Sequence, residues 1–397
     1  MTMSEVALAI GIIVLAGLLS GKVIQRVRAP MVIGFLITGV LLGPSVFNVI
    51  SVEMSEELEL LKAAALGIIA YTIGSELDFK KIINILRSIF VITVVQSVVT
   101  FALVFVSTYY LFNFPLPVAL MLGAIAPASA PASPLAVSRE YGAKGSFTTT
   151  LLGTVAFLDA VTLTIFAVVS AVVGVIVRGE NLKGSFLLEP LWEVGGSLVL
   201  GLLVGLVVVM VTRRLQQKPQ VLAFLLGVIL LNIGLADLWH LSPLLVNMAT
   251  GVAVTNLAPP KLALSSFEDV EMFLYVSFFF LAGADLRLEI LAQYSVLVGV
   301  IGYIIVRGIG KVGGTFLGAR LARSEERVQK YLGFALFTKA GLSVGLAMMV
   351  QKSFPEISEI VVAIVLGGVV VCELVGPFGT RFALLSSGEC KKGPGVA

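Results

Sequence analysis

The chain of 397 residues is poor in the residues that build metal clusters and disulfide frameworks, with one histidine and two cysteines. His240 is too few for a histidine-based metal site, and Cys372 and Cys390 do not have the spacing of metal ligands or the number needed for a disulfide framework. Charged residues make up only 13% of the chain, and its formal net charge is +3. This small charge gives no indication of nucleic acid as a partner.

The chain is instead dominated by apolar residues, which make up 58% of it and give a mean hydropathy of +1.05. No soluble core could absorb so much apolar surface, so the sequence predicts an all-α integral membrane protein in a lipid bilayer. The first 21 residues lack a basic leader and a small-residue cleavage site, and we interpret them as a first span. Charged and Pro/Gly-rich stretches divide the hydropathy into about 13 spans, starting near residues 4, 30, 57, 87, 116, 146, 187, 219, 241, 267, 293, 328 and 357.

The predicted loops differ in their content of lysine and arginine. Alternate loops and the C-terminal tail carry 19 of the 27 basic residues, the opposite loops carry 5, and the remaining 3 fall inside spans. By the positive-inside rule, the N-terminus lies outside and the C-terminus in the cytoplasm of a multi-pass protein of a prokaryotic cell membrane.

An internal repeat relates the two halves of the chain. Three glycines in the first half align with three in the second at an offset of about 210 residues: Gly39 with Gly251, Gly74 with Gly283, and Gly123 with Gly333. The copies are seven spans apart, and this odd separation inverts the second copy in the bilayer, as in secondary transporters. We therefore expect a single transporter domain with repeat one at about 1–178, a linker span at 179–215, repeat two at 216–385 and a short tail at 386–397.

Asp159 is the one charged residue between Phe147 and Val177. At about 1.5 Å per residue it lies roughly 20 Å into its span, close to the middle of the bilayer. Because an acid there costs about 2.5–3.5 kcal/mol on insertion scales, it indicates an ion or proton site. The alternative is a structural carboxylate that a basic partner neutralises.

The fifth span contains three prolines within eight residues, Pro127, Pro131 and Pro134. These prolines remove backbone donors and predict a discontinuous helix, although a proline kink stabilised by its neighbours is an alternative. Freed carbonyls and hydroxyl groups suit a small hard cation, which prefers oxygen ligands. The candidate ligands for a cation or proton are Ser129, Ser133, Thr154 and Asp159, with Asp159 and Ser129 as the main Na+ ligands.

Four further charged residues fall inside spans, namely Arg307, Lys311, Lys339 and Glu373. Lys339 faces the break of the fifth span from the partner segment of the second repeat, where it either compensates the dipoles of the half-helices or contacts the substrate. Arg307 is interpreted as the ion-pair partner of a membrane carboxylate, Asp159 or Glu373. Glu373, the second deep acid, has either a transport role or a role in that ion pair.

Several motifs together resemble one family. They are GFLITGVLLGP (34–44), GSELDF (74–79), the proline-rich segment (123–136), Leu158-Asp159, LSPLLVNMATGVAVTN (241–256), VRGIGK (307–311 with the preceding Val) and CELVGP (372–377). Over nearly its whole length the chain resembles the second branch of the monovalent cation:proton antiporter superfamily, which includes Na+/H+ antiporters and Kef-type potassium efflux proteins. The resemblance implies a homodimer with inverted repeats and crossed discontinuous helices, and no cofactor besides the transported ions.

The chain departs from this family at two places in the site. Leu158 stands where the family usually has Asp, Asn or Gln, and Ser129-Ala130 stands where many members have Thr-Asp or Thr-Ala. With no acid at 158, and with Arg307 expected to neutralise Glu373, we expect one proton to be exchanged per cation.

The sequence thus predicts an antiporter that exchanges Na+ for H+ by competition at Asp159. The alternatives are a K+/H+ antiporter or a Kef-type cation channel. We expect no enzyme activity, because an intramembrane aspartyl mechanism needs two close carboxylates.

Overall fold

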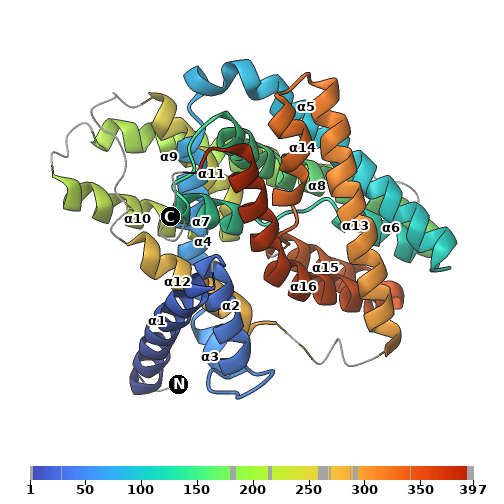
Figure 1. Ribbon diagram of the computed structural model, residues 1–397, viewed down its shortest axis with the longest axis horizontal. Coiled ribbons are helices and arrows are strands. Elements are labelled where there is room, and N and C mark those ends of the chain that lie inside the picture. The colour runs from blue at the N-terminus through green and yellow to red at the C-terminus, as the bar shows by residue number, and fades with distance from the viewer. Residues whose placement is uncertain are drawn as a thin grey trace. The chain divides into compact units, whose positions relative to one another are not determined.

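The structure, a computed structural model, describes residues 3–27, 29–178, 185–212, 217–257, 267, 270–286, 288, 294–339 and 341–390. Helices form nearly all of these residues, and no strand occurs among them (Figure 1). In the first half they are α1 (Met3–Arg26), α2 (Met31–Leu42), α3 (Val52–Glu57), α4 (Glu59–Glu76), α5 (Phe79–Val106) with its π-helical extension η1 (Ser107–Leu111), α6 (Leu116–Ile125), α7 (Ala132–Glu140) and α8 (Ser146–Arg178). In the second half they are α9 (Ser185–Thr212), α10 (Lys218–Leu238), α11 (Pro243–Leu257), α12 (Glu271–Ala284), α13 (Tyr294–Leu321), α14 (Glu326–Ala335), α15 (Gly341–Ser353) and α16 (Pro355–Ser387).

The all-α membrane architecture expected from the sequence is confirmed. Seven of the described helices are long and apolar enough to cross a bilayer, and five shorter apolar helices accompany them. The helices begin close to the predicted span starts, while the number of spans stays a prediction. The tail residues 391–397, with Lys391 and Lys392 of the charge asymmetry, lie outside the described part of the chain.

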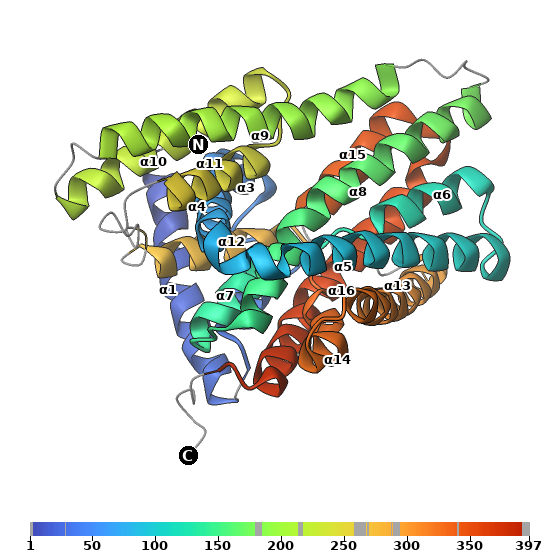
Figure 2. The ribbon, with the colours of Figure 1, turned by 90° about the horizontal axis from the view of Figure 1, so that it is seen from above.

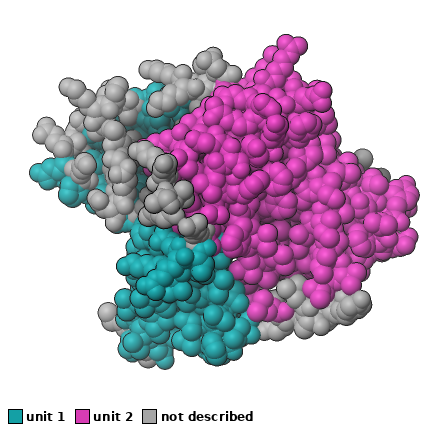
Figure 3. Space-filling view, in the orientation of Figure 1, with its two compact units in different colours: residues 1–27, 31–84, 191–285 teal, residues 28–30, 85–190, 286–397 magenta. Residues whose placement is uncertain are grey.

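The chain divides into two compact units (Figure 3). Unit 1 comprises residues 1–27, 31–84 and 191–285, and unit 2 comprises residues 28–30, 85–190 and 286–397. Both units draw on both halves of the sequence. Asp159 and all the other site residues predicted from the sequence belong to unit 2.

In unit 1, the repeat-related glycines mark two close helix crossings. A Cβ atom at Gly39 of α2 would collide with the backbone of Phe280 in α12, and one at Gly283 of α12 would collide with that of Leu36. The same relation joins α4 to α11: Gly74 lies against the backbone of Met248 and Gly251 against that of Tyr71. Each crossing therefore pairs a helix of one repeat with a helix of the other, and the absence of a side chain is what permits the close approach.

In unit 2, α5 packs against a glycine face of α13, and the two helices are neighbours in Figure 2, where α13 is seen nearly end-on. Gly310, Gly314 and Gly318 recur every four residues, which places them on one face of α13. A Cβ atom on them would lie 2.9 Å from the Cα atoms of Thr100, Gln96 and Ile92, respectively. The glycine-rich sequence around Arg307 therefore brings α13 close to α5 and fixes the position of its basic residues.

Helix α8 is held by an apolar face and by its capped first turn. Phe147, Leu151, Val155 and Leu158 are fully buried in one apolar cluster of unit 2. Their spacing of three to four residues is that of one face of a helix. Leu158 therefore belongs to the packing face of α8, which gives a structural reason for an apolar residue before Asp159.

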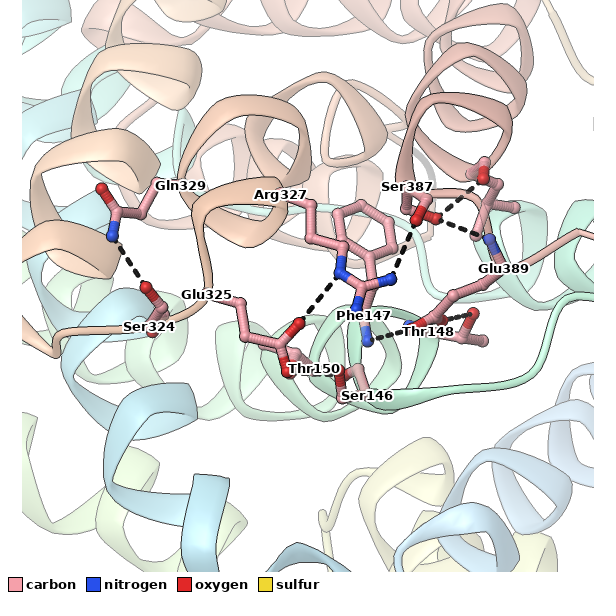
Figure 4. A network of polar contacts seen from close by, with 11 residues as sticks. Ser146, Phe147, Thr148, Thr150, Ser324, Glu325, Arg327, Gln329, Ser387 and Glu389 are labelled. Carbon is pink, nitrogen blue, oxygen red and sulfur yellow. Dashed lines mark hydrogen bonds and ion pairs between the residues drawn. The ribbon is translucent and has the colours of Figure 1, made fainter.

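The first turn of α8 is capped by a carboxylate from beyond the end of α16 (Figure 4). The backbone N–H groups of Phe147 and Thr148 donate to Oε1 and Oε2 of Glu389, each at 2.8 Å, and the Thr148 hydroxyl also donates to Oε2 at 2.8 Å. Gly145 has a φ of 157°, and a Cβ atom there would collide with this carboxylate. An anion at a helix N-terminus satisfies free N–H groups and interacts favourably with the helix dipole.

Candidate functional site

Two helices of unit 2 are interrupted. Between α6 and α7 the helix stops over residues 126–131; the other interruption separates α14, which ends at Ala335, from α15, which begins at Gly341. Pro131 precedes the first residue of α7 and Pro134 lies in its first turn, where a missing N–H group is tolerated. The predicted discontinuous helix is confirmed, and the alternative of a healed proline kink is wrong.

The two breaks bind each other through hydrogen bonds. The N–H group of Ala130 donates to the carbonyl oxygen of Thr338 at 3.2 Å, and the Thr338 hydroxyl donates to the carbonyl oxygen of Ala130 at 3.0 Å. The Ser129 hydroxyl donates to the carbonyl oxygen of Leu336 at 2.8 Å. The discontinuous helices therefore cross at their breaks, as the inverted repeat predicts.

Arg307 of α13 is fully buried and holds both breaks. Its Nε donates to the carbonyl oxygen of Ala126 at 3.0 Å. Its Nη1 donates to the carbonyl oxygen of Phe337 at 2.9 Å and to Sγ of Cys372 at 3.6 Å. Its Nη2 donates to the carbonyl oxygens of Ala128 at 2.7 Å and Thr338 at 3.4 Å. The expected ion pair of Arg307 with Asp159 or Glu373 is wrong, because the guanidinium group binds backbone carbonyl groups instead. Interrupted helices leave carbonyl oxygens without intrahelical donors. A guanidinium group is planar and has several donors, so it can bind carbonyl oxygens of two segments at once.

Lys311, one turn after Arg307 on α13, is a site residue that the sequence analysis did not single out. Its ammonium group is fully buried and donates to the carbonyl oxygen of Pro127 at 2.7 Å and to the Ser129 hydroxyl at 2.5 Å. Its charge also acts on Asp159, although no ion pair within 4 Å joins these two described residues. The sequence held one indication of this role: Lys311 follows Arg307 by four residues, which places both side chains on one face of α13.

Lys339, in the break before α15, does not bind the carbonyl groups of the other break. Its ammonium group donates to the hydroxyl of Tyr303 at 2.6 Å and lies 4.5 Å from the centre of the same ring. The break carbonyl groups are bound by Arg307 and Lys311. The direct contact of Lys339 is thus a buried tyrosine of α13, and its role toward the half-helix dipoles or the substrate stays a prediction.

Asp159 is 4% exposed, and its Oδ1 atom has no hydrogen-bond partner in the described part of the structure. The hydroxyl groups of Ser133 and Thr154 are also buried without a partner. So is the hydroxyl of Thr162, three residues after Asp159 and on the same side of α8, which the sequence analysis did not consider. Because α8 packs against α6 and α7, the break and the acid lie in one part of unit 2. Buried oxygen atoms without donors suit a small hard cation or a proton.

Ser129 is already engaged, since it donates to Leu336 O and accepts from Lys311. Its oxygen still has a second lone pair. Its role as a cation ligand stays a prediction, as do those of Ser133, Thr154 and Asp159. Glu373 of α16 is 2% exposed, and neither of its oxygens has a partner among the described residues.

Inverted repeats, two crossed discontinuous helices and buried charges at their crossing define a secondary ion transporter. The chain belongs to the family of transmembrane sodium/hydrogen exchangers, which it matches over residues 10–385. A Na(+)/H(+) antiporter, NhaH, from Halobacillus aidingensis is 25% identical over 260 residues, which are 62% of this chain. The match spans 63% of the length of that relative.

Two structures of the sodium proton antiporter MjNhaP1 from Methanocaldococcus jannaschii share the fold. The structure at pH 8 has a TM-score of 0.66 at 19% identity, and an electron-microscopy structure has a TM-score of 0.76 at 17% identity. In both comparisons the alignment covers 98% of this chain and 96% of the other. The fold is therefore shared, and the family match over residues 10–385 favours the sodium/hydrogen exchangers over the Kef-type alternative.

Proposed function

We propose that this chain is a secondary antiporter in which Na+ and H+ compete for the carboxyl group of Asp159. The observation that carries the proposal is a buried carboxyl oxygen that has no hydrogen-bond partner among the described residues, in a helix packed against α6 and α7 on either side of the break. Family membership supports exchange of these two ions. The names of the relatives support Na+ as the cation, with Li+ and K+ as weaker candidates.

The exchange follows from the occupancy of one group. A protonated Asp159 carries H+ and has no charge to attract a cation. An ionised Asp159, with the free hydroxyl oxygens of Ser133 and Thr154, offers the oxygen ligands that Na+ prefers. Binding of either H+ or Na+ neutralises the carboxylate of Asp159, whose charge is costly to bury. The occupied site therefore alternates between the two sides of the membrane more readily than the empty site.

The buried cations hold the crossing in place during this exchange. Arg307 binds carbonyl groups of both breaks, and Lys311 binds Pro127 and Ser129 of the first break. The Lys311 ammonium group lies within electrostatic range of Asp159 and balances its charge when the site is empty. We further propose a homodimer in the cell membrane, with the N-terminus outside, as the charge asymmetry indicates.

The test is proton movement in proteoliposomes that contain a pH-sensitive dye. Adding Na+, Li+ or K+ in turn to the wild-type protein identifies the exchanged cation. Asp159→Asn keeps the side-chain volume and cannot release a proton, so its exchange should be abolished while its folding and insertion stay normal. Asp237→Asn, at an exposed acid near the end of α10, is the matched control and should exchange like the wild type.

Two results would contradict the proposal. Substantial Na+-driven proton flux through Asp159→Asn would show that the exchanged ions use another group. Na+ flux through the wild type without any pH change would indicate a channel rather than an antiporter.

A further inference from the structure

Glu373 is a buried acid that competition at Asp159 does not use. It lies in α16 and is 2% exposed, and both carboxyl oxygens lack a hydrogen-bond partner among the described residues. An isolated ionised carboxylate is far more costly to bury than the neutral acid. Without a donor or a bound cation, the protonated form of Glu373 is therefore the less costly one.

Arg307 cannot serve as the hydrogen-bonded partner of Glu373. A guanidinium group has five N–H donors. In Arg307 all five have other acceptors, which are four carbonyl oxygens of the breaks and the sulfur of Cys372. A hydrogen-bonded ion pair with Glu373 would require Arg307 to release one of the breaks.

Glu373 lies along the second break. The preceding residue, Cys372, accepts a hydrogen bond from Arg307, and a Cβ atom on Gly376, one turn later, would collide with Thr338. One turn beyond that, the Thr380 hydroxyl donates to the carbonyl oxygen of Ala335, at the end of α14. This side of α16 therefore follows α14 to its break and brings Glu373 next to the helix crossing.

Two opposing effects act on the proton of Glu373. Burial without a donor among the described residues favours the neutral form, whereas the positive charge of the neighbouring Arg307, which donates to Cys372, favours the ionised form. On the elements packed against α16, the titratable residues whose side chains the structure describes are Asp159 on α8, Arg139 and Glu140 on α7, Tyr303, Arg307, Lys311 and Arg320 on α13, Glu326, Arg327, Lys330 and Tyr331 on α14, and Lys339 in the second break. A buried carboxyl group beside a cation that does not bind it directly can exchange its proton.

We propose that Glu373 is a second proton-binding group of the transport cycle. Its carboxylate takes up one proton from water on one side of the membrane and releases it on the other, in addition to the proton exchanged at Asp159. This inference rests on the proposed antiport. It changes the expected stoichiometry to two protons per Na+, because the one-for-one expectation depended on an Arg307–Glu373 pair that does not form.

Two protons per Na+ would move one net charge in each cycle, so the membrane potential should drive the exchange. A potential of about 100 mV shifts the equilibrium Na+ gradient about 50-fold for one net charge. Na+-loaded proteoliposomes with an outward K+ gradient and valinomycin have a negative interior. Their proton uptake should be faster than that of vesicles clamped at zero potential.

Glu373→Gln should retain Na+-driven proton uptake and lose its dependence on potential. Glu193→Gln, at a partly buried acid of α9 in unit 1, is the matched control and should keep it. A wild-type rate that is equal at both potentials would overturn the inference. Because this decision uses the wild-type protein, it holds even if Glu373→Gln fails to fold.

Infrared difference spectra between low and high pH give a second readout that is independent of transport. The wild-type spectrum should contain a carbonyl-stretch component from the protonated carboxyl group of Glu373. We expect this component to be absent from the spectrum of Glu373→Gln and present in that of Asp159→Asn. A Glu373→Gln spectrum identical to that of the wild type would contradict the inference. No Na+-driven proton flux in the wild type would refute the proposed antiport itself, whereas potential-independent flux would refute only the role of Glu373.

Discussion

Replacing Arg307 tests whether one side chain holds the two helix breaks together. Arg307→Met keeps most of the side-chain length and removes all five donors, so the carbonyl oxygens of Ala126, Ala128, Phe337 and Thr338 lose a partner. The carbonyl oxygen of Thr338 keeps the N–H group of Ala130 as a donor, so three carbonyl oxygens are left without a partner. A buried polar group in that state costs about 1–3 kcal/mol, so three of them amount to about 3–9 kcal/mol. Water entering the vacated space would bring the loss toward the lower value. Even about 3 kcal/mol is a large part of a typical folding free energy of about 5–15 kcal/mol.

The assay compares variants after heating in detergent, with the folded fraction measured by size-exclusion chromatography. Arg307→Lys keeps the charge, but its donors sit on one atom and can serve only one break, so its stability should be intermediate. Arg381→Met is the control, because the Nε of Arg381 donates to the hydroxyl of Tyr141, a partly buried residue away from the breaks. An apparent melting temperature of Arg307→Met equal to that of Arg381→Met would refute the role of Arg307.

Two further predictions concern Lys311 and the cap of α8. Ser129→Ala removes the side-chain acceptor that Lys311 has among the described residues and leaves its ammonium group free to compete with Na+ for Asp159. The apparent KM for Na+ should therefore rise about tenfold, which corresponds to the loss of a hydrogen bond of about 1.4 kcal/mol. Ser138→Ala is the control and should leave KM unchanged; an unchanged KM in Ser129→Ala would place the cation elsewhere. Burial and the nearby Glu389 carboxylate raise the pKa of the Cys390 thiol. Glu389→Ala removes the effect of the carboxylate, so maleimide labelling of Cys390 should shift to lower pH because more thiolate is present at a given pH. Cys372 is 2% exposed and should not interfere, and an unshifted labelling profile would show that the Glu389 carboxylate does not act on Cys390.

The sequence was sufficient to predict those features of the fold that residue type determines. Three prolines within eight residues of one apolar span favour an interrupted helix over a kinked one, and an acid far from either end of an apolar span indicates burial. The repeat was also detectable, since a glycine at a close helix crossing cannot be replaced by a larger residue without moving the backbone. These signals predicted the break between α6 and α7, the burial of Asp159 and the repeat relation of α2 to α11 and of α4 to α12. The pairing of α2 with α12 and of α4 with α11 is seen only in the structure.

The partners of the buried cations could not be predicted in the same way. Arg307 and Lys311 bind backbone carbonyl oxygens, which every residue has, so no residue type marks the acceptor. The break between α14 and α15 contains no proline, and only its relation to the first repeat indicated it. Residue type alone suggested an acidic partner for Arg307, Asp159 or Glu373. Its actual partners are the carbonyl oxygens of two interrupted helices.

The glycine crossings of unit 1 also impose an order on biogenesis. Gly283, the partner of α2 at its crossing, is synthesised about 240 residues after Gly39, which takes about 10–50 s at about 5–20 residues per second. Gly251 of α11 is synthesised about 180 residues after Gly74 of α4, so this second crossing also closes late. During this time the first repeat resides in the membrane with its close-packing surfaces unmatched, so lipid or the insertion machinery has to occupy them. A substitution that slows the closing of these crossings would reduce the amount of assembled protein in the cell without altering the exchange rate of the molecules that complete them.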